Sequence, residues 1–284
     1  MSRLAETEAH IASMSELLAI VGAMRSLAGM RMQEAQRILP GTRRYADMVA
    51  SAISDTLLLM GDREEALSAG GAGRAVIVCT AEHGFVGGFN NRLVEAAEAV
   101  LEAGDTLFML GTRGAVLATE RGIAPGWSHP MSTRCAAVPQ TVGALLANLY
   151  GRIAAGEIGR VEAIFACYRQ GGASTVERRL LLPLDTEALE PRQPRQSPLV
   201  DLDPLDLHER LIGEYLFALM TEAAIESIAS ENAARFATMS AAHENVSDKV
   251  DELRQEARQA RQSEITTELL DLVTGADAQL GDSR

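Results

Sequence analysis

The last third of the chain carries an apolar pattern that repeats every seven residues. From about residue 207 to 276, two sets of positions alternate in steps of four and three, which places both sets on one face of a helix. The first set is Leu211, Ala218, Ile225, Asn232, Met239, Val246, Leu253 and Ala260, and the second is Tyr215, Glu222, Ala229, Phe236, His243, Val250 and Ala257. The pattern predicts one helix, roughly 100 Å long. Such a helix needs a partner that covers its apolar stripe.

The beginning of the chain carries a matching pattern. Its two sets are Leu4, Ile11, Leu18, Arg25, Met32 and Leu39, and Met14, Val21, Ala28 and Ala35. The two ends can therefore pair as a left-handed, antiparallel coiled coil if the middle of the chain folds into a compact domain. Small residues such as Gly22 and Ala233 allow close approach of the two backbones. Two ordinary amphipathic helices in a larger bundle are the alternative.

The N-terminal helix is predicted over residues 1–60, with a kink or break near residue 40. Pro40 lacks a backbone donor and its ring clashes with the preceding turn, and Gly41 follows it. At the other end, the C-terminal helix is expected over residues 205–276. Asp203 fits the N-cap, Pro204 the first position and Asp206 the first turn. A polar tail over residues 277–284 is expected to fray.

The middle of the chain alternates short apolar runs with helical patterns. Strands are predicted at 75–79, 106–110, 161–168 and 179–184, and helices at 92–101, 114–120 and 142–153. This order predicts a Rossmann-like α/β domain over residues 74–184 with a partly parallel sheet. Gly171 and Gly172 are expected to turn the chain between the last two strands. Residues 185–204 contain four prolines and read as a linker, whereas no structure is assigned around Trp127.

Composition narrows the function classes. The net charge of −13 disfavours nucleic acid and bare anionic membrane as primary partners. No secretory signal or long uncharged apolar run stands out, which predicts a cytosolic chain with no direct membrane insertion. The three cysteines lack metal-ligand spacing, and Cys79 and Cys167 lie in apolar runs, so buried free thiols are expected.

Candidates for chemistry are few. A glycine-rich turn, Gly84 to Asn90, follows the first predicted strand, but its spacing matches neither a dinucleotide fingerprint nor a P-loop. A tight strand-to-helix turn is the favoured interpretation. The five histidines are dispersed, and His83 has no obvious carboxylate or nucleophile partner. No cofactor, metal site or catalytic residue is predicted for this chain.

Several motifs together resemble the gamma subunit of F-type ATP synthases. In the last helix the matching residues are Glu226-Ser227-Ile228-Ala229-Ser230-Glu231-Asn232-Ala233-Ala234-Arg235, Met239, Ala242, Asn245, Arg261-Gln262, Ile265-Thr266, Glu268-Leu269, Val273 and Gly275-Ala276. In the middle they are Gly84, Gly87-Gly88-Phe89-Asn90 and Leu181-Leu182-Pro183-Leu184. In the first helix they are Ile11, Ser13, Ile20, Ala23-Met24, Ala28, Met32 and Ala35-Gln36.

The resemblance implies a non-catalytic central-stalk rotor on the cytoplasmic face of the inner (plasma) membrane. Its partners would be the alpha and beta subunits of the ATPase head, the epsilon subunit and the c-ring, with ATP chemistry on the beta subunits. Arg261 and Gln262 match the family position that contacts a beta-subunit loop, and Met24 is expected near them on the opposing helix. Gly84, Gly87, Gly88, Asn90, Ser230, Glu231 and Arg235 are expected to be structural signature residues. A coiled-coil adaptor and a Rossmann-like nucleotide-binding enzyme are the alternatives.

The chain also departs from the family pattern. Ser15, Ala19 and Gly22 stand where lysines are usual, and Arg31 keeps one such charge. His83, Phe85 and Val86 replace the usual Arg, Leu and Cys of the turn. Together with the acidic balance, these departures suggest a divergent paralogue of the kind found in the alternate, sodium-type ATPases, with the housekeeping subunit as the alternative.

Overall fold

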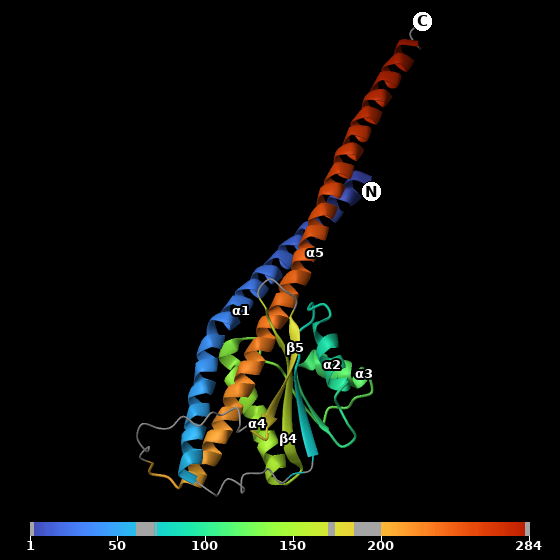
Figure 1. The fold of residues 1–284 in the computed structure, drawn as a ribbon. Helices are drawn as coiled ribbons and strands as arrows, with labels where there is room; N and C mark the ends of the chain where they lie inside the picture. Colours follow the sequence, from blue (N-terminus) through green and yellow to red (C-terminus); the bar gives the residue numbers. More distant parts are fainter. Residues whose placement is uncertain (1–2, 61–70, 72, 170–173, 185–199, 282–284) are drawn as a thin grey trace. The chain divides into compact units, whose positions relative to one another are not determined.

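The computed structural model describes residues 3–60, 71, 73–169, 174–184 and 200–281. The chain divides into two compact units: a helix-pair unit, Met1–Leu27 with Phe236–Arg284, and an α/β unit, Ala28–Arg235. Two long helices from opposite ends of the chain, α1 (Arg3–Met60) and α5 (Pro204–Gly281), contribute to both units (Figure 1). The prediction of two long terminal helices is therefore confirmed.

Helix α1 passes through Pro40 and Gly41 without ending, so the break allowed for there is absent. Both residues are exposed, whereas the neighbouring Leu39 is buried in the core of the α/β unit. Because proline has no N–H, the carbonyl of Gln36 loses its helical donor, and water can satisfy it at this surface. Packing on the buried side holds the helix together across this point.

Helix α5 begins as predicted. The Asp203 side chain accepts a hydrogen bond from the backbone N–H of Leu205 at 3.0 Å, Pro204 is the first helical residue, and Asp206 lies in the first turn. The helix continues to Gly281, beyond the predicted end at residue 276. The Gly171-Gly172 turn and residues 185–199 of the predicted linker lie outside the described residues.

The α/β unit contains one five-stranded sheet in the order β3-β2-β1-β4-β5. Strands β1 (Gly73–Cys79), β2 (Thr106–Leu110), β3 (Trp127–His129) and β4 (Ile158–Cys167) are joined in parallel. Strand β5 (Thr175–Leu182) pairs antiparallel with β4 at one edge. The partly parallel sheet is therefore confirmed. The three-residue strand β3 was missed because it is too short to show a periodic pattern.

Helices cover both faces of the sheet. Alternate β1 residues point to opposite sides, with Ala75 and Ile77 in one apolar core and Val76 and Val78 in the other. The first core packs the sheet against α4 (Val138–Ala154), α1 and α5, and the second against α2 (Phe89–Glu98) and α3 (Thr112–Glu120). Burial on both faces explains why β1 reads as a continuous apolar run.

Within the α/β unit, α1 and α5 run antiparallel. Arg43 bonds to Glu222, and Thr56, farther along α1, lies 2.9 Å from the ring of His208, which is earlier in α5. The same order holds in the helix-pair unit, where Glu8 meets Arg261 and Gly22 meets His243. A β-carbon added at Gly22 would lie 3.6 Å from the His243 ring, so glycine does permit close packing there.

The predicted seam of the helix-pair unit is largely the buried one. Val21, Met239, Val250 and Leu253 are buried, and the other predicted seam positions are half-buried, among them Met14, Val246 and Ala257. The prediction is wrong at Phe236, because this expected seam residue is 40% exposed. An α-helix turns every 3.6 residues, so a strict seven-residue count drifts away from the contact face.

Candidate functional site

Helix α5 crosses the carboxyl ends of the central parallel strands, and two serines attach it there. The Ser227 hydroxyl donates to the carbonyl of Cys79 at 2.6 Å, and the Ser230 hydroxyl donates to the carbonyl of Ala166 at 2.9 Å. Cys79 ends β1, Ala166 lies near the end of β4, and both serines are buried.

This position is where an open α/β sheet usually holds its ligand. The strand order reverses between β1 and β4, and the crevice outside their carboxyl ends is the general binding site of such sheets. Here the crevice is occupied by the chain's own serines and helix. The arrangement therefore argues against a Rossmann-like nucleotide site at this point and favours a sheet built to carry a helix.

One arginine joins α5 to the glycine-rich turn. The Arg235 guanidinium donates to the carbonyls of His83 and Gly84 at 3.3 Å, and to the carboxylate of Glu231 at 2.7 Å. It also donates to the side-chain oxygen of Asn232 at 3.3 Å. The signature residues Glu231 and Arg235 thus meet the signature Gly84 in space, 151 residues apart for the Arg235–Gly84 pair.

The turn itself has the geometry of a strand-to-helix connection. The Asn90 side chain accepts a hydrogen bond from the backbone N–H of Ala81 at 2.9 Å, which ties the start of α2 to the end of β1. Gly87 has a φ of 54°, a conformation that glycine adopts without steric cost. Phe85 has a φ of 62° and is 65% exposed, so the turn presents an aromatic ring to solvent. Gly88 is the N-cap of α2.

Glu231 is a buried carboxylate near two arginines, Arg235 and Arg31. Burial raises the pKa of Glu231 above its ordinary value, while Arg235 acts in the opposite direction. A buried carboxylate of this kind costs desolvation energy unless it is paired and hydrogen-bonded. Its salt bridge to Arg235 supplies that pairing, and the turn carbonyls bound by the same guanidinium hold the arginine in place.

The predicted partner-contact residues do not lie together. Arg261 donates to Glu8 at 2.6 Å, and its side chain is 62% exposed. Gln262 is also exposed. Met24 lies farther along α1, about 24 Å from the level of Glu8 at the helical rise, and close to Gly22, which packs on His243. The expectation that Met24 lies near Arg261 is therefore wrong, because the antiparallel register places Glu8 there.

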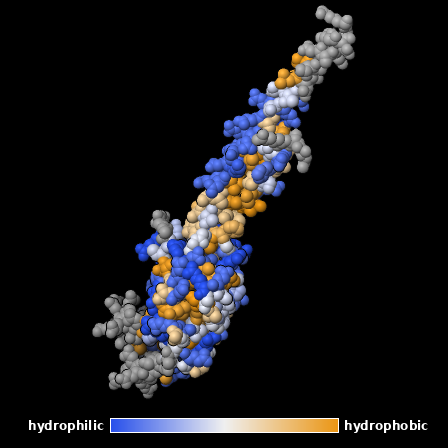
Figure 2. Space-filling model, turned by 90° about the vertical axis from the view of Figure 1, so that its right-hand side faces the viewer, coloured by the Kyte–Doolittle hydropathy of each residue, from blue (hydrophilic) through white to orange (hydrophobic). Residues whose placement is uncertain are grey.

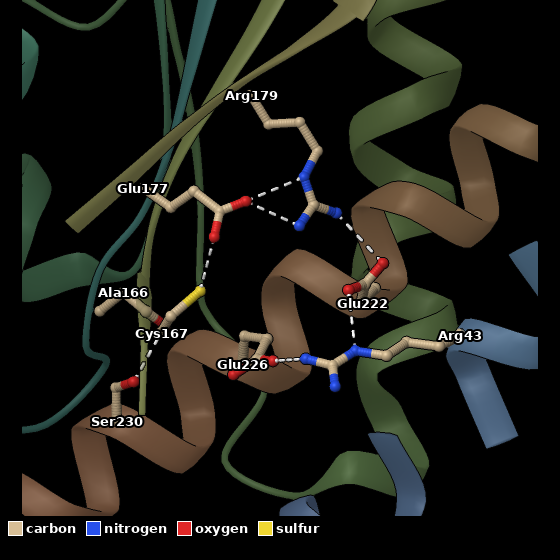
Figure 3. A network of polar contacts seen from close by, with 8 residues as sticks. All are labelled: Arg43, Ala166, Cys167, Glu177, Arg179, Glu222, Glu226 and Ser230. Atoms are coloured by element: carbon tan, nitrogen blue, oxygen red, sulfur yellow. Dashed lines mark hydrogen bonds and ion pairs between the residues drawn. The ribbon is translucent and has the colours of Figure 1, made fainter. Parts of the chain in front are cut away.

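Sequence reasoning missed a network of charged side chains between the sheet and the two long helices (Figure 3). The Glu222 carboxylate accepts from Arg43 of α1 at 3.2 Å and from Arg179 of β5 at 3.1 Å. Glu226, one turn later, also bonds to Arg43. Burial raises the pKa of Glu226, with Arg43 opposing the rise and Glu222 adding to it. The available signal was a glutamate at an apolar position of the heptad, Glu222.

The network continues along β5 to a thiol. Arg179 donates to Glu177 at 2.8 Å and stacks over the Phe165 ring at 4.9 Å, and the Cys167 thiol donates to Glu177 at 3.1 Å. Burial raises the pKa of the Cys167 thiol, and the Glu177 bond adds to the rise. Cys79 is a buried free thiol as predicted, whereas Cys167 is only half-buried. Neither arrangement resembles an activated nucleophile.

The long helices expose apolar side chains. Figure 2 shows apolar surface along them. The exposed members in the helix-pair unit are Leu17, Ile20, Leu27, Phe236, Ile265, Leu269, Leu270 and Val273, and those of α1 in the α/β unit are Met30, Ile38 and Met48. Part of α1 within Leu4–Leu57 also reaches a mean hydropathy of 1.4, which satisfies the length and composition of a membrane span. Exposed apolar side chains on these helices favour a contact with protein or membrane.

A metal site has no support among the described residues. No group of three or more His, Cys, Asp or Glu side chains converges in the part of the chain that the structure describes. Glu82, next to His83, accepts hydrogen bonds from the backbone N–H and the hydroxyl of Thr112 and from the backbone N–H of Met131, and so caps α3. These contacts lower the pKa of Glu82 against the raising effect of burial.

Comparisons with known proteins agree over nearly the whole chain. A family model described as ATP synthase matches residues 3–279. The ATP synthase gamma chain of Saccharopolyspora erythraea is 28% identical, with 98% of each chain covered. That of Chlorobaculum tepidum is 27% identical, with 91% of this chain and 92% of the relative covered.

Solved structures with the same fold include rotors. The rotor of the Euglena gracilis mitochondrial ATP synthase aligns with a TM-score of 0.61 at 12% identity, covering 92% of this chain and 98% of that one. A chain from the central stalk and c-ring of the Tetrahymena thermophila enzyme aligns with a TM-score of 0.56 at 15% identity, covering 78% and 99%.

Proposed function

The chain belongs to the ATP synthase family as a gamma-type central-stalk rotor subunit, and we propose that it couples ion flow through a membrane ring to conformational change at catalytic beta subunits. The observation that carries this proposal is the pair of long antiparallel helices with apolar side chains left exposed. ATP chemistry belongs to the beta subunits, and this chain supplies contacts.

The exposed apolar side chains of α1 and α5 fit the inside of a ring of alpha and beta subunits. Ile20 is 57% exposed and Leu269 58% exposed, so a surrounding protein surface would remove them from water. A heptad-paired helix with charges such as Glu16 and Arg25 within the same apolar segment fits such a channel better than lipid. This accounts for the apolar stretch of α1 without membrane insertion.

An asymmetric shaft works by favouring different conformations at different sites. Each catalytic site meets a different side of the helices, and a conformation is populated according to the contacts it makes. Turning the shaft changes which site receives which contacts. The α/β unit would rest on the epsilon subunit and the c-ring at the cytoplasmic face of the inner (plasma) membrane. Ser15, Ala19 and Gly22 stand where the family usually has lysines, and the prediction of a sodium-type paralogue is based on these differences.

Arg261 and Gln262 are proposed contacts to a loop of the beta subunit. Both are exposed on α5, and among the described residues Arg261 forms an ion pair with Glu8, whose side chain is 49% exposed. A guanidinium on this surface retains donors for a partner carboxylate. Met24 is proposed as a separate contact, at another level of α1.

Purification of the tagged chain from its native host in mild detergent tests the proposal. Alpha- and beta-type ATPase subunits are expected to co-purify in stoichiometric amounts. Recovery of the chain without any ATPase subunit would contradict the assignment.

A substitution tests the contact residue. Arg261→Ala should lower ATP-driven ion pumping by the assembled complex, by about fivefold for a contact worth on the order of 1 kcal/mol. Two controls should leave pumping unchanged: Arg210→Ala, at an exposed arginine on the same helix, and Glu8→Ala, which removes the intrachain bond. Equal pumping by Arg261→Ala and wild type would remove Arg261 from the contact set.

A further inference from the structure

The carboxylate of Glu222 holds three elements of the α/β unit at one point. Its two oxygens are bound by different guanidiniums, Arg43 from α1 at 3.2 Å and Arg179 from β5 at 3.1 Å. Glu222 itself lies on α5 and is 7% exposed. Figure 3 shows the two arginines approaching this carboxylate from opposite sides. Displacement of α1, α5 or β5 relative to the others would break a charge-assisted bond.

Each arginine is itself fixed by a second contact. Arg43 also bonds to Glu226, so α1 is attached to two successive turns of α5. Arg179 donates to Glu177 on its own strand and lies over the Phe165 ring of β4 at 4.9 Å. The guanidiniums therefore keep their orientation, and the bonds to Glu222 act in fixed directions.

The face of α5 in this core combines large side chains, Leu216, Met220 and Ile225, with a run of alanines that offers less resistance to sliding. Ala218, Ala223, Ala224 and Ala229 of α5 are fully buried in the same core, and an alanine surface has shallow ridges. Apolar burial is non-directional, so it holds α5 on the sheet without fixing its rotation about its own axis. The hydrogen bonds of Ser227 and Ser230 restrain α5 at the strand ends, and the directional bonds at Glu222 and Glu226 restrain it against α1 and β5.

We propose that Glu222, with Arg43 and Arg179, is a torsional clamp that prevents α5 from turning against the sheet when the rotor carries load. The inference rests on the proposed rotor function and names positioning residues for it. A buried ion pair adds little net stability relative to well-packed apolar side chains, because desolvation offsets attraction. The proposed role of this ion-pair network is therefore to restrain the orientation of α5, and not to add net stability.

The test measures torsional stiffness in the whole complex. The head is immobilised, a probe is attached to the α/β unit through Val116→Cys on the exposed face of α3, and angular fluctuation is recorded without nucleotide. Glu222→Gln removes the charge of the carboxylate and Arg179→Gln removes the guanidinium. Each should lower stiffness by about twofold, and the double variant should be no softer than the softer single, because both changes weaken the same Glu222–Arg179 bond.

A matched control removes an ion pair that touches neither long helix. Glu95 pairs with Arg121 at 2.9 Å between α2 and α3, so Glu95→Gln should keep wild-type stiffness. If the single variants fail to fold, Glu222→Met with Arg179→Met keeps apolar volume at the site and should assemble yet remain soft.

The experiment distinguishes failure of the clamp proposal from failure of the rotor function. Wild-type stiffness in folded, assembled Glu222 variants, including the methionine pair, would overturn the clamp and leave the rotor function in place. Absence of ATPase head subunits from the wild-type preparation would overturn the rotor function itself.

Discussion

Glu162 shows how a single buried carboxylate depends on its neighbours. It is 1% exposed on β4, and its oxygens lie 2.7 Å from Arg178, 2.8 Å from Arg160 and 3.8 Å from Arg74. The bond from Arg178 lowers the pKa of Glu162, burial acts against it, and the Arg160 bond lowers the pKa further. The charged form is thus preferred in the folded protein.

The depressed pKa predicts an acid-sensitive contribution to stability. Because the folded pKa lies below the unfolded value, the stabilisation is complete above the ordinary glutamate pKa of about 4.3 and is lost as the pH falls through the folded pKa. Glu162→Gln should therefore lower the free energy of unfolding by about 2 kcal/mol at pH 7 and by less at pH 3. Urea titration at both values measures this, with exposed Glu98→Gln as control. An equal loss at both pH values would contradict the assignment.

Two helical glycines predict opposite effects of the same substitution. A β-carbon at Gly114 of α3 would lie 2.1 Å from the Thr80 hydroxyl oxygen and 2.5 Å from its β-carbon, whereas one at Gly143 of α4 would meet nothing within 4 Å. Gly114→Ala should destabilise the protein by about 2 kcal/mol or more through overpacking. Gly143→Ala should stabilise it by about 0.5–1 kcal/mol. Thermal unfolding distinguishes the pair, and a neutral Gly114→Ala would refute this account.

At the scale of elements, the position of Pro40 within α1 leads to a prediction about the stability of the protein. The helix passes through it although the Gln36 carbonyl lacks its donor. Pro40→Ala restores the donor on an exposed face, so it should raise the free energy of unfolding by about 1–3 kcal/mol. Gly41→Ala, which meets nothing within 4 Å, should add about 1 kcal/mol through helix propensity alone. A loss of stability in Pro40→Ala would show that the helix requires the proline.

The elements also show what the sequence could predict. Apolar runs and heptads indicated the long helices, the strands and the seam, because burial imposes their period. The start of α5 followed from Asp203 and Pro204. The continuous helix at Pro40 did not follow, because its buried side is formed by distant residues. Strand β3 was too short to leave a pattern.

Residues that act together across the chain were harder to predict. The signature Ser230, Glu231 and Arg235 were identified by resemblance, but their contacts with Gly84 and Ala166 depend on the folded arrangement. The ion pairs of Glu222 with Arg43 and Arg179 join α5 to α1 and β5. The sequence signal for this network was Glu222 itself, a glutamate at a heptad position where an apolar residue is expected. Met24 was placed wrongly because spacing within each helix does not determine the register between helices.

At the scale of the molecule, the α/β unit is a support for a helix. Its switch-point crevice receives Ser227 and Ser230 of α5 instead of an external ligand. The same fold that elsewhere binds nucleotides here attaches the long helix through buried hydroxyls, Arg235 and the Glu222 network. The apolar side chains exposed on the helices are the surface that the rotor proposal assigns to other subunits of the complex.

The central claim is that this chain turns inside an ATPase head. It is tested most directly by immobilising the purified complex through its head subunits and observing a probe on Val116→Cys of the α/β unit during ATP hydrolysis. The native thiols Cys79 and Cys135 are buried and Cys167 is half-buried, so the exposed position is the preferred site of labelling. Continuous rotation in one direction, dependent on ATP, is the predicted result. Steady ATP hydrolysis by the same complexes with a stationary probe would contradict it.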